Sequence, residues 1–321
     1  MSLFAIQLLT GLANAMFLFL VASGLSLIFG VTRIVNFAHG SLYMLAAYLT
    51  YTLAAALPLG PASFYVGAIL AALGVACLGG VIEVCLLRRI YRAPELYQLL
   101  LTFALVLVIG DAVRFFWGTE NKAGPSAPGL SGSVAILDQR FPAYDLAMLL
   151  VGPLVALGLW WLLHRTRPGI LIRAATSDRE MVGALGVNQR RLFTGVFVLG
   201  AFLAGLAGAL QVPRVALTTV MDVSVIAEAF VVVVIGGMGS AFGALFAAVL
   251  IGVLQAFGIL LLPREFHLAI IFILMAAVLI LRPWGLLGRP EAHIRPEGEG
   301  AGMGMGGPLF LPRWVGITLG I

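Results

Sequence analysis

The sequence predicts an all-α protein, a polytopic transmembrane helix bundle of about 8–9 membrane segments, some of them short or broken. Composition is the first observation behind this prediction. Of the 321 residues, 61% are hydrophobic and 10% are charged, and the mean hydropathy is +1.08. A water-soluble protein of this length needs more polar surface than 19 basic and 14 acidic residues supply. A bundle in lipid needs apolar residues outside as well as inside, so the bilayer is the predicted solvent.

A series of apolar runs is the second observation. A membrane-spanning helix needs about 20 predominantly apolar residues. The stretch 223–236 is also apolar, although it is short for a full crossing. The runs that qualify, or nearly qualify, lie at about 8–30, 39–57, 62–87, 96–117, 143–163, 192–212, 240–262 and 265–282.

Basic residues in the loops predict the orientation, because short cytoplasmic loops are enriched in arginine and lysine. Three arginine-rich segments, at 88–92, 165–191 and 282–313, are expected inside. This assignment places 14 of the 19 basic residues inside and four outside, with Arg114 within a span. The N-terminus is then outside, the C-terminus is cytoplasmic, and the loop 118–142 is external. The basic residues form no continuous stripe, so no nucleic-acid partner is expected.

The chain is expected to divide near residue 288. Residues 1–288 hold the apolar runs and form the membrane domain, in which 164–191 is a cytoplasmic loop. Residues 289–321 form a tail that is rich in Gly and Pro.

The cytoplasmic loop contains the pattern of a short helix at about 178–185. Ser177 and Glu180 have the spacing of a capping box, Asp178 and Glu180 lie in the first turn, and Gly186 is placed to end the helix. Met181, Val182 and Leu185 form one apolar face. Such a helix either lies on the membrane surface, packs under its own bundle or docks in a groove of another protein.

Two polar or glycine-rich breaks interrupt the apolar runs, at 36–40 (NFAHG) and 236–240 (GGMGS). Paired breaks of this kind indicate a translocation pathway in transporters, although glycine and serine also serve close helix packing. His39 has no second metal ligand nearby, and no metal site is expected. The candidate pathway residues are Asn36, His39, Gly40, Gly236, Gly237, Gly239 and Ser240.

Three acidic residues lie within apolar runs, where ionisable groups are costly and usually paired or functional. Asp111 is expected to pair with Arg114, and Glu83 lies close in sequence to Arg88. Glu228 has no such neighbour, so it joins the candidate pathway residues.

Four segments resemble one family of transport proteins, the permease subunits of ATP-binding-cassette (ABC) importers for branched-chain amino acids. Residues 165–187 resemble the loop that holds the coupling helix of that family. Residues 24–48, with the specific NFAHG block, are similar to the family's start. Residues 232–252, with IGGMGS, and 282–288 (RPWGLLG) resemble its late segments. The resemblance covers residues 8–288 and is nearest to the LivH-type permeases.

The resemblance implies a permease subunit in a bacterial or archaeal cytoplasmic (inner) membrane. The implied partners are ABC ATPase subunits, a second permease that is expected to be a different chain, an external substrate-binding protein and membrane lipid. Arg173, Asp178, Glu180 and Gly186 correspond to coupling positions of the family. No cofactor is expected, and the chain is not expected to be an enzyme, because a P-loop needs a GK[ST] step and Lys122 is followed by Ala123.

Three alternatives remain open from the sequence. An importer of the same class for urea or short amides fits the same motifs. An ion-coupled secondary transporter also uses broken helices, but it has no need for a capped cytoplasmic helix. An intramembrane hydrolase with Ser240 and His39 or His267 lacks the sequence context of a nucleophile elbow.

Overall fold

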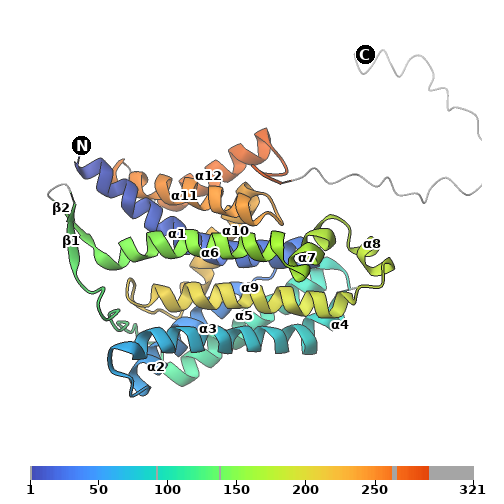
Figure 1. Cartoon of the computed structure of the whole chain (residues 1–321), viewed down its shortest axis with the longest axis horizontal. Helices are drawn as coiled ribbons and strands as arrows, with labels where there is room; N and C mark the ends of the chain where they lie inside the picture. The colour runs from blue at the N-terminus through green and yellow to red at the C-terminus, as the bar shows by residue number, and fades with distance from the viewer. Residues whose placement is uncertain (1, 92, 137–138, 262–265, 289–321) are drawn as a thin grey trace, which may run out of the picture. The chain divides into compact units, whose positions relative to one another are not determined.

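The computed structural model describes residues 2–91, 93–136, 139–261 and 266–288. Within these residues the protein is a bundle of helices with one small β-hairpin (Figure 1), which confirms the all-α prediction. The long helices are α1 (Ser2–Thr32), α2 (Ala38–Ala56), α3 (Ser63–Ile82), α5 (Glu95–Trp117), α6 (Ala143–Arg165), α9 (Gln189–Gln211), α10 (Met221–Gly236), α11 (Ala241–Leu261) and α12 (Phe266–Leu281).

Short elements connect the long helices. A 3-10 turn, η1 (Gly60–Ala62), precedes α3, and a π-helix, η2 (Glu83–Leu87), joins α3 to α4 (Arg88–Ile90). Two further helices, α7 (Arg167–Ser177) and α8 (Arg179–Ala184), lie between α6 and α9. The sequence predicted only the second of these, at about 178–185.

Length and apolar composition allow six helical stretches of the described chain to cross a membrane. A shorter apolar helix follows at Ala269–Leu281. The chain is thus a multi-pass membrane protein. The six stretches are Leu3–Thr32, Gly60–Ile90, Glu95–Trp117, Ala143–Arg165, Gln189–Gln211 and Ala241–Gly258.

Helix α1 lies at the centre of the bundle, and almost all of its apolar stretch is buried inside the protein. It packs against α6, α9, α10 and α11, whereas α2, α3 and α9 pack against one another. The outer faces of α5 and α6 expose large apolar side chains such as Leu100, Phe116 and Trp161. Lipid or another membrane protein must cover these faces, because water would not tolerate them.

The first sequence break folds back into the bundle. Helix α1 ends at Thr32, and Arg33 adopts a positive φ of 60°. The chain then returns alongside α1, because His39 at the start of α2 contacts the carbonyl oxygen of Val21. Val21 lies 11 residues before the end of α1, which is about 16 Å at 1.5 Å per residue. Residues 33–37 are therefore non-helical backbone, of which Arg33 is exposed while residues 34–37 are buried or half-buried.

The long loop at 118–142 carries the hairpin of β1 (Ser133–Ile136) and β2 (Gln139–Pro142), which pair antiparallel. Lys122 forms a backbone bridge with Leu217 in the connection between α9 and α10. The sequence had predicted an external loop here and had not predicted the hairpin. The predicted tail at 289–321 lies outside the described residues.

Candidate functional site

Asn36 and His39 are buried polar residues with unmet hydrogen-bonding capacity. Asn36 is 1% exposed, and neither atom of its side-chain amide has a hydrogen-bond partner. The Nε2 atom of His39 lies 3.0 Å from the carbonyl oxygen of Val21, while Nδ1 has no partner. A buried polar group without a partner destabilises a fold by roughly 1–3 kcal/mol, so each such group calls for an explanation.

The start of α2 is held against the start of α10. Gly40 lies against the backbone carbonyl of Asp222, where a larger residue would collide. The Ser41 hydroxyl donates a hydrogen bond of 3.0 Å to Oδ2 of Asp222. Asp222 is buried, and its Oδ1 accepts a hydrogen bond of 2.9 Å from the backbone N–H of Val223.

Sequence reasoning missed Ser41 and Asp222. Both lie within a few residues of predicted features, and Asp222 is an acidic residue in the first turn of an apolar helix. Helix N-termini favour such residues, so this pattern was an available signal. The contact between the two residues joins segments 181 positions apart, which no local pattern predicts.

The three acidic residues of the apolar runs all have partners. Glu83 pairs with Arg88 at 2.9 Å, and Asp111 pairs with Arg114 at 3.1 Å, as predicted. Glu228 is half-buried on α10 and hydrogen-bonds Gln255 of α11. The sequence offered no neighbour for Glu228 because its partner lies on a different helix.

The glycine-rich break at 236–240 forms a tight turn between α10 and α11. Gly237 and Gly239 have φ values of +98° and +85°, which disfavour any residue with a side chain. The backbone N–H groups of Leu286 and Leu287 donate to the carbonyl oxygens of Ile235 and Gly236, at 2.7 and 3.1 Å. The RPWGLLG segment thus satisfies carbonyl groups that the end of α10 would leave open.

The remaining contacts of this turn lie toward the loop between α6 and α9. Ser240 accepts a hydrogen bond of 3.0 Å from the N–H of Gly243 and so caps α11. Gly239 packs closely against Gly30 of α1 and the side chain of Thr176 in α7. The described contacts of Gly236, Gly237, Gly239 and Ser240 therefore lie at the end of α10 opposite Asp222.

Helices α7 and α8 lie within residues 164–191, the loop that the sequence predicted to be cytoplasmic, at the end of the bundle away from the β-hairpin (Figure 1). The structure corrects the cap of α8. Asp178, not Ser177, is the capping residue, and its Oδ1 accepts from the N–H groups of Glu180 and Met181 at 3.0 and 2.9 Å. Ser177 ends α7 and donates to the carbonyl oxygen of Arg173. The capping-box spacing failed because α7, a helix that the sequence did not predict, includes Ser177.

The predicted apolar face of α8 is divided. Met181 and Leu185 are 58% and 76% exposed, whereas Val182 is 5% exposed and packs into the protein's own core. Gly186, with a φ of +83°, follows the helix as predicted. Arg173 and Glu180 are exposed. The loop thus presents two large apolar side chains, surrounded by charged ones, away from the bundle.

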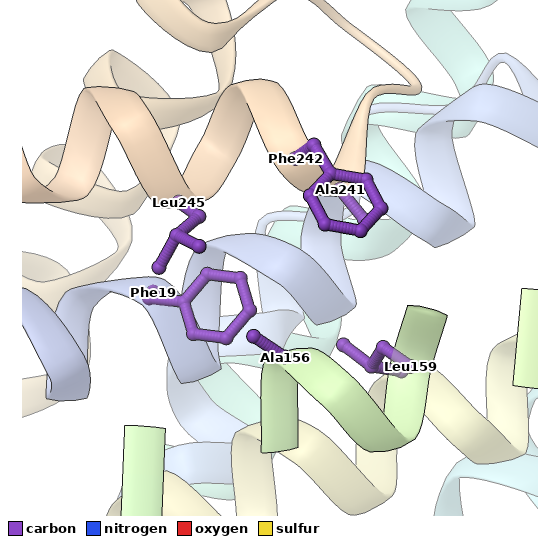
Figure 2. Close-up of a pocket in the computed structure, with 6 residues that line it drawn as sticks. All are labelled: Phe19, Ala156, Leu159, Ala241, Phe242 and Leu245. Carbon is purple, nitrogen blue, oxygen red and sulfur yellow. The ribbon is translucent and has the colours of Figure 1, made fainter. Parts of the chain in front are cut away.

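A narrow gap between α1, α6 and α11 is lined entirely by apolar side chains (Figure 2). A wider, open groove next to it shares Ala156, Phe242 and Leu245 and adds Pro153, Leu157 and Trp160. Apart from the indole N–H of Trp160, neither hollow offers a charged or hydrogen-bonding side chain. The buried polar side chains of Asn36, His39 and Asp222 lie elsewhere in the bundle.

Comparisons with known proteins identify the family. The family model described as branched-chain amino acid transport system / permease component matches residues 7–279. BraD of Pseudomonas aeruginosa, a branched-chain amino acid transport system permease protein, is 30% identical, covering 89% of this chain and 96% of BraD. LivH of Escherichia coli K12 is 28% identical, covering 85% of this chain and 92% of LivH.

A more distant relative is the fructose import permease protein FrcC of Rhizobium meliloti. It is 26% identical, covering 66% of this chain and 61% of its own length. No solved structure matches the chain. The family consists of membrane permease components rather than enzymes. Because its model matches most of the sequence, the chain belongs to the permease component family of branched-chain amino acid transport systems.

Proposed function

We propose that this chain forms the translocation pathway for branched-chain amino acids in an ATP-driven importer. The observation that carries the proposal is the match of the family model over residues 7–279, together with relatives such as BraD and LivH that align over nearly their whole length. The proposal places the chain in the cytoplasmic membrane of a bacterium or archaeon, with the N-terminus outside and α7 and α8 in the cytoplasm.

The proposed ATPase contact is α8. Met181 and Leu185 are exposed, yet both are large and apolar. Burying such a side chain stabilises a contact by roughly 1.5–3 kcal/mol, and a helix of this length needs support from tertiary contacts. Energy must come from partner subunits, because the sequence holds no P-loop lysine. A second permease, expected to be a different chain, and an external binding protein complete the proposed complex.

Asn36, His39, Gly40 and Glu228 are proposed to line or border the pathway. Unpartnered amide and imidazole atoms at Asn36 and His39 can bond to the charged groups of a passing amino acid. Burial in protein also allows the non-helical backbone at 34–37 to exist at membrane depth. Selectivity can reside in the external binding protein, so only weak binding to this chain is expected.

Helix α10 links the proposed pathway to the proposed ATPase contact. Its start holds Asp222, which bonds to Ser41 of α2. Its end leads into Gly239, which packs against Thr176 of α7. We assign Gly236, Gly237, Gly239 and Ser240 to this joint and not to the lining of the pathway. A shift of α7 would then reach the buried start of α2 through one rigid helix.

The function is tested by uptake in proteoliposomes. The chain is tagged and purified with its associated subunits, the complex is reconstituted with the binding protein outside and ATP inside, and uptake of labelled leucine, isoleucine and valine is measured. ATP-dependent uptake of these three amino acids, with none of urea or fructose, supports the proposal. ATP-dependent uptake of urea or fructose alone would contradict the proposed substrate, and uptake without ATP would contradict the importer class.

A further inference from the structure

Glu83 is a fully buried carboxylate at the point where α3 changes its winding. It is 0% exposed and begins the π-helix η2, an element that is rare and often marks functional positions. The proposed pathway does not use Glu83. A charge buried in this way is retained only where it is paired and hydrogen-bonded.

Four hydrogen bonds converge on this carboxylate. Oε2 accepts from Arg88 Nη2 at 2.9 Å and from the Thr194 hydroxyl at 2.7 Å. Oε1 accepts from the Tyr91 hydroxyl at 3.0 Å and from Arg88 Nε at 3.4 Å. Burial, and after it the negative charge of Glu83, raises the pKa of the Tyr91 phenol above its ordinary value. The phenol therefore stays protonated and remains a donor.

Thr194 is the member of this network that comes from another part of the chain. It lies on α9, 111 residues from Glu83, and it also accepts from Arg88 Nη2 at 2.6 Å. Phe193 beside it stacks edge-on against the Tyr91 ring at 5.3 Å. Glu83, Arg88, Tyr91 and Thr194, which we term the Glu83 cluster, thus fasten the end of α3 to the start of α9.

The start of α9 is attached to α8. The first residue of α9, Gln189, donates through Nε2 to the carbonyl oxygen of Arg179 at 2.6 Å. Val187 donates its N–H to the carbonyl oxygen of Val182. Asn188 caps α9 by accepting from the N–H of Arg191. A displacement of α8 therefore acts directly on the turn of α9 that carries Thr194.

Packed helices also connect the Glu83 cluster to the break between α1 and α2. Helices α3, α9 and α2 pack closely on one another, with Gly79 against Ala201 and Gly208 against the backbone of Tyr43. Gly200 of α9 faces Gly24 of α1 next to the imidazole of His39. Such close contacts transmit displacement, since packed interiors are not readily compressed.

We infer that Glu83 is a positioning residue that makes α3 and α9 move as one body when the ATPase displaces α8. This inference rests on the proposed function, because it assumes that α8 meets an ATPase. Without the cluster, the start of α9 could shift while the end of α3 remains in place. ATP would then be hydrolysed without a corresponding opening of the pathway.

The test compares the number of ATP molecules hydrolysed per leucine taken up by the reconstituted complex. Thr194→Val keeps the shape of the side chain and removes the hydroxyl, whereas Thr194→Ser keeps the hydroxyl. We expect Thr194→Val and Glu83→Gln to raise this ratio by about fivefold or more, the lower end of typical coupling effects between sites. Thr194→Ser should restore a ratio close to that of the wild type.

A matched control lies at the other end of the bundle. Asp145 of α6 pairs with Arg214 at 2.7 Å, and this pair is also largely buried. Asp145→Asn removes a comparable ion pair but is not linked to α8, so it should lower thermal stability and leave the ratio unchanged. A wild-type ratio in both Thr194→Val and Glu83→Gln, or an equal rise in Asp145→Asn, would overturn the inference.

Failure of the proposed substrate gives a different result. A wild-type complex that takes up no leucine, while its ATP hydrolysis still responds to the binding protein, contradicts the substrate and not the Glu83 cluster. The response of ATP hydrolysis to the binding protein then tests the role of the Glu83 cluster. Hydrolysis in Thr194→Val and Glu83→Gln should become independent of the binding protein, and retention of the wild-type response would overturn the inference.

Discussion

Asn36 combines burial inside a membrane protein with a side-chain amide that has no hydrogen-bond partner. An amide serves stability only when it is bonded, and an apolar side chain of similar size would serve packing better. Close helix packing explains Gly40, because this glycine lies against the backbone of α10. It does not explain a side-chain amide at Asn36, three residues after Arg33. We therefore propose that the translocation pathway requires the polarity of Asn36.

Replacing Asn36 by leucine should therefore separate stability from transport. We expect Asn36→Leu to leave the thermal stability of the purified complex unchanged or to increase it, because an unpaired buried amide disappears. Uptake of leucine should fall by about an order of magnitude, the effect of roughly 1.4 kcal/mol on a barrier. Thermal unfolding and proteoliposome uptake measure the two quantities.

Tyr48 provides the control for this variant, since it lies on α2, the helix that follows Asn36, and its buried hydroxyl also has no partner. Tyr48→Phe removes that hydroxyl at a position about three turns further along α2 and should not reduce uptake. If Asn36→Leu transports as well as Tyr48→Phe, then Asn36 is not part of the pathway.

Helix α8 shows how a very short helix is specified at both ends. Asp178 satisfies two backbone N–H groups at its start, and Gly186 takes the left-handed conformation after its end. Val182 attaches the helix to the bundle, which leaves Met181 and Leu185 exposed. The element is thus held in place by its caps, by the buried side chain of Val182 and by the hydrogen bond from Gln189 to the carbonyl oxygen of Arg179.

Removal of the cap should loosen α8 without unfolding the bundle. We expect Asp178→Ala to destabilise the helix by about 1 kcal/mol, the usual effect of losing a capping side chain. Amide hydrogen exchange at residues 180–185 should become several-fold faster. Ser177→Ala is the control, because Ser177 bonds only to the preceding helix. Equal exchange in the two variants would contradict the assignment of Asp178 as the cap.

The helices themselves could be predicted from the sequence because apolar runs and glycine-rich breaks are local signals. The break after α1 and the short helix between α6 and α9 both appeared near their predicted positions. Helix α7 could not be predicted in the same way. Its sequence, RPGILIRAATS, opens with proline and glycine, and it is stabilised by the Thr166 cap and by buried Ile172 and Ala175. Those contacts exist only after α6 and α9 are in place.

At the scale of the whole molecule, the sequence identified which residues are unusual but not which of them meet. Asn36 and the glycine-rich turn both interrupt apolar runs, so the sequence analysis grouped them together. In the structure, the glycine-rich turn packs against Thr176 of α7. Glu83 lies close in sequence to Arg88, whereas its bond to Thr194 joins segments 111 residues apart and was not predicted. Contacts over more than one hundred residues depend on helix packing, which periodicity does not encode.

The orientation of the bundle is a further prediction at this scale. Charge bias places 14 basic residues inside and four outside. In a variant without Cys77 and Cys85, an impermeant thiol reagent should label Ala123→Cys in intact cells and label Ala184→Cys only after the membrane is opened. Both positions are exposed in the structure. The reverse pattern would contradict the proposed orientation.

The central claim, that α8 connects this permease to an ATPase, depends most directly on Leu185. An exposed leucine that becomes buried in a partner contributes roughly 1.5–3 kcal/mol, so Leu185→Asp should weaken ATPase association by at least about tenfold. Leu59→Asp is the control, since Leu59 is also exposed but lies in the turn before α3, at the opposite end of that helix from α4.

The decisive measurement is the amount of ATPase that co-purifies with each variant, together with leucine uptake by the reconstituted complex. The account predicts that Leu185→Asp loses the ATPase or hydrolyses ATP without uptake, while the membrane bundle remains folded and Leu59→Asp behaves as the wild type. Normal ATPase association and normal uptake by Leu185→Asp would show that α8 is not the coupling contact.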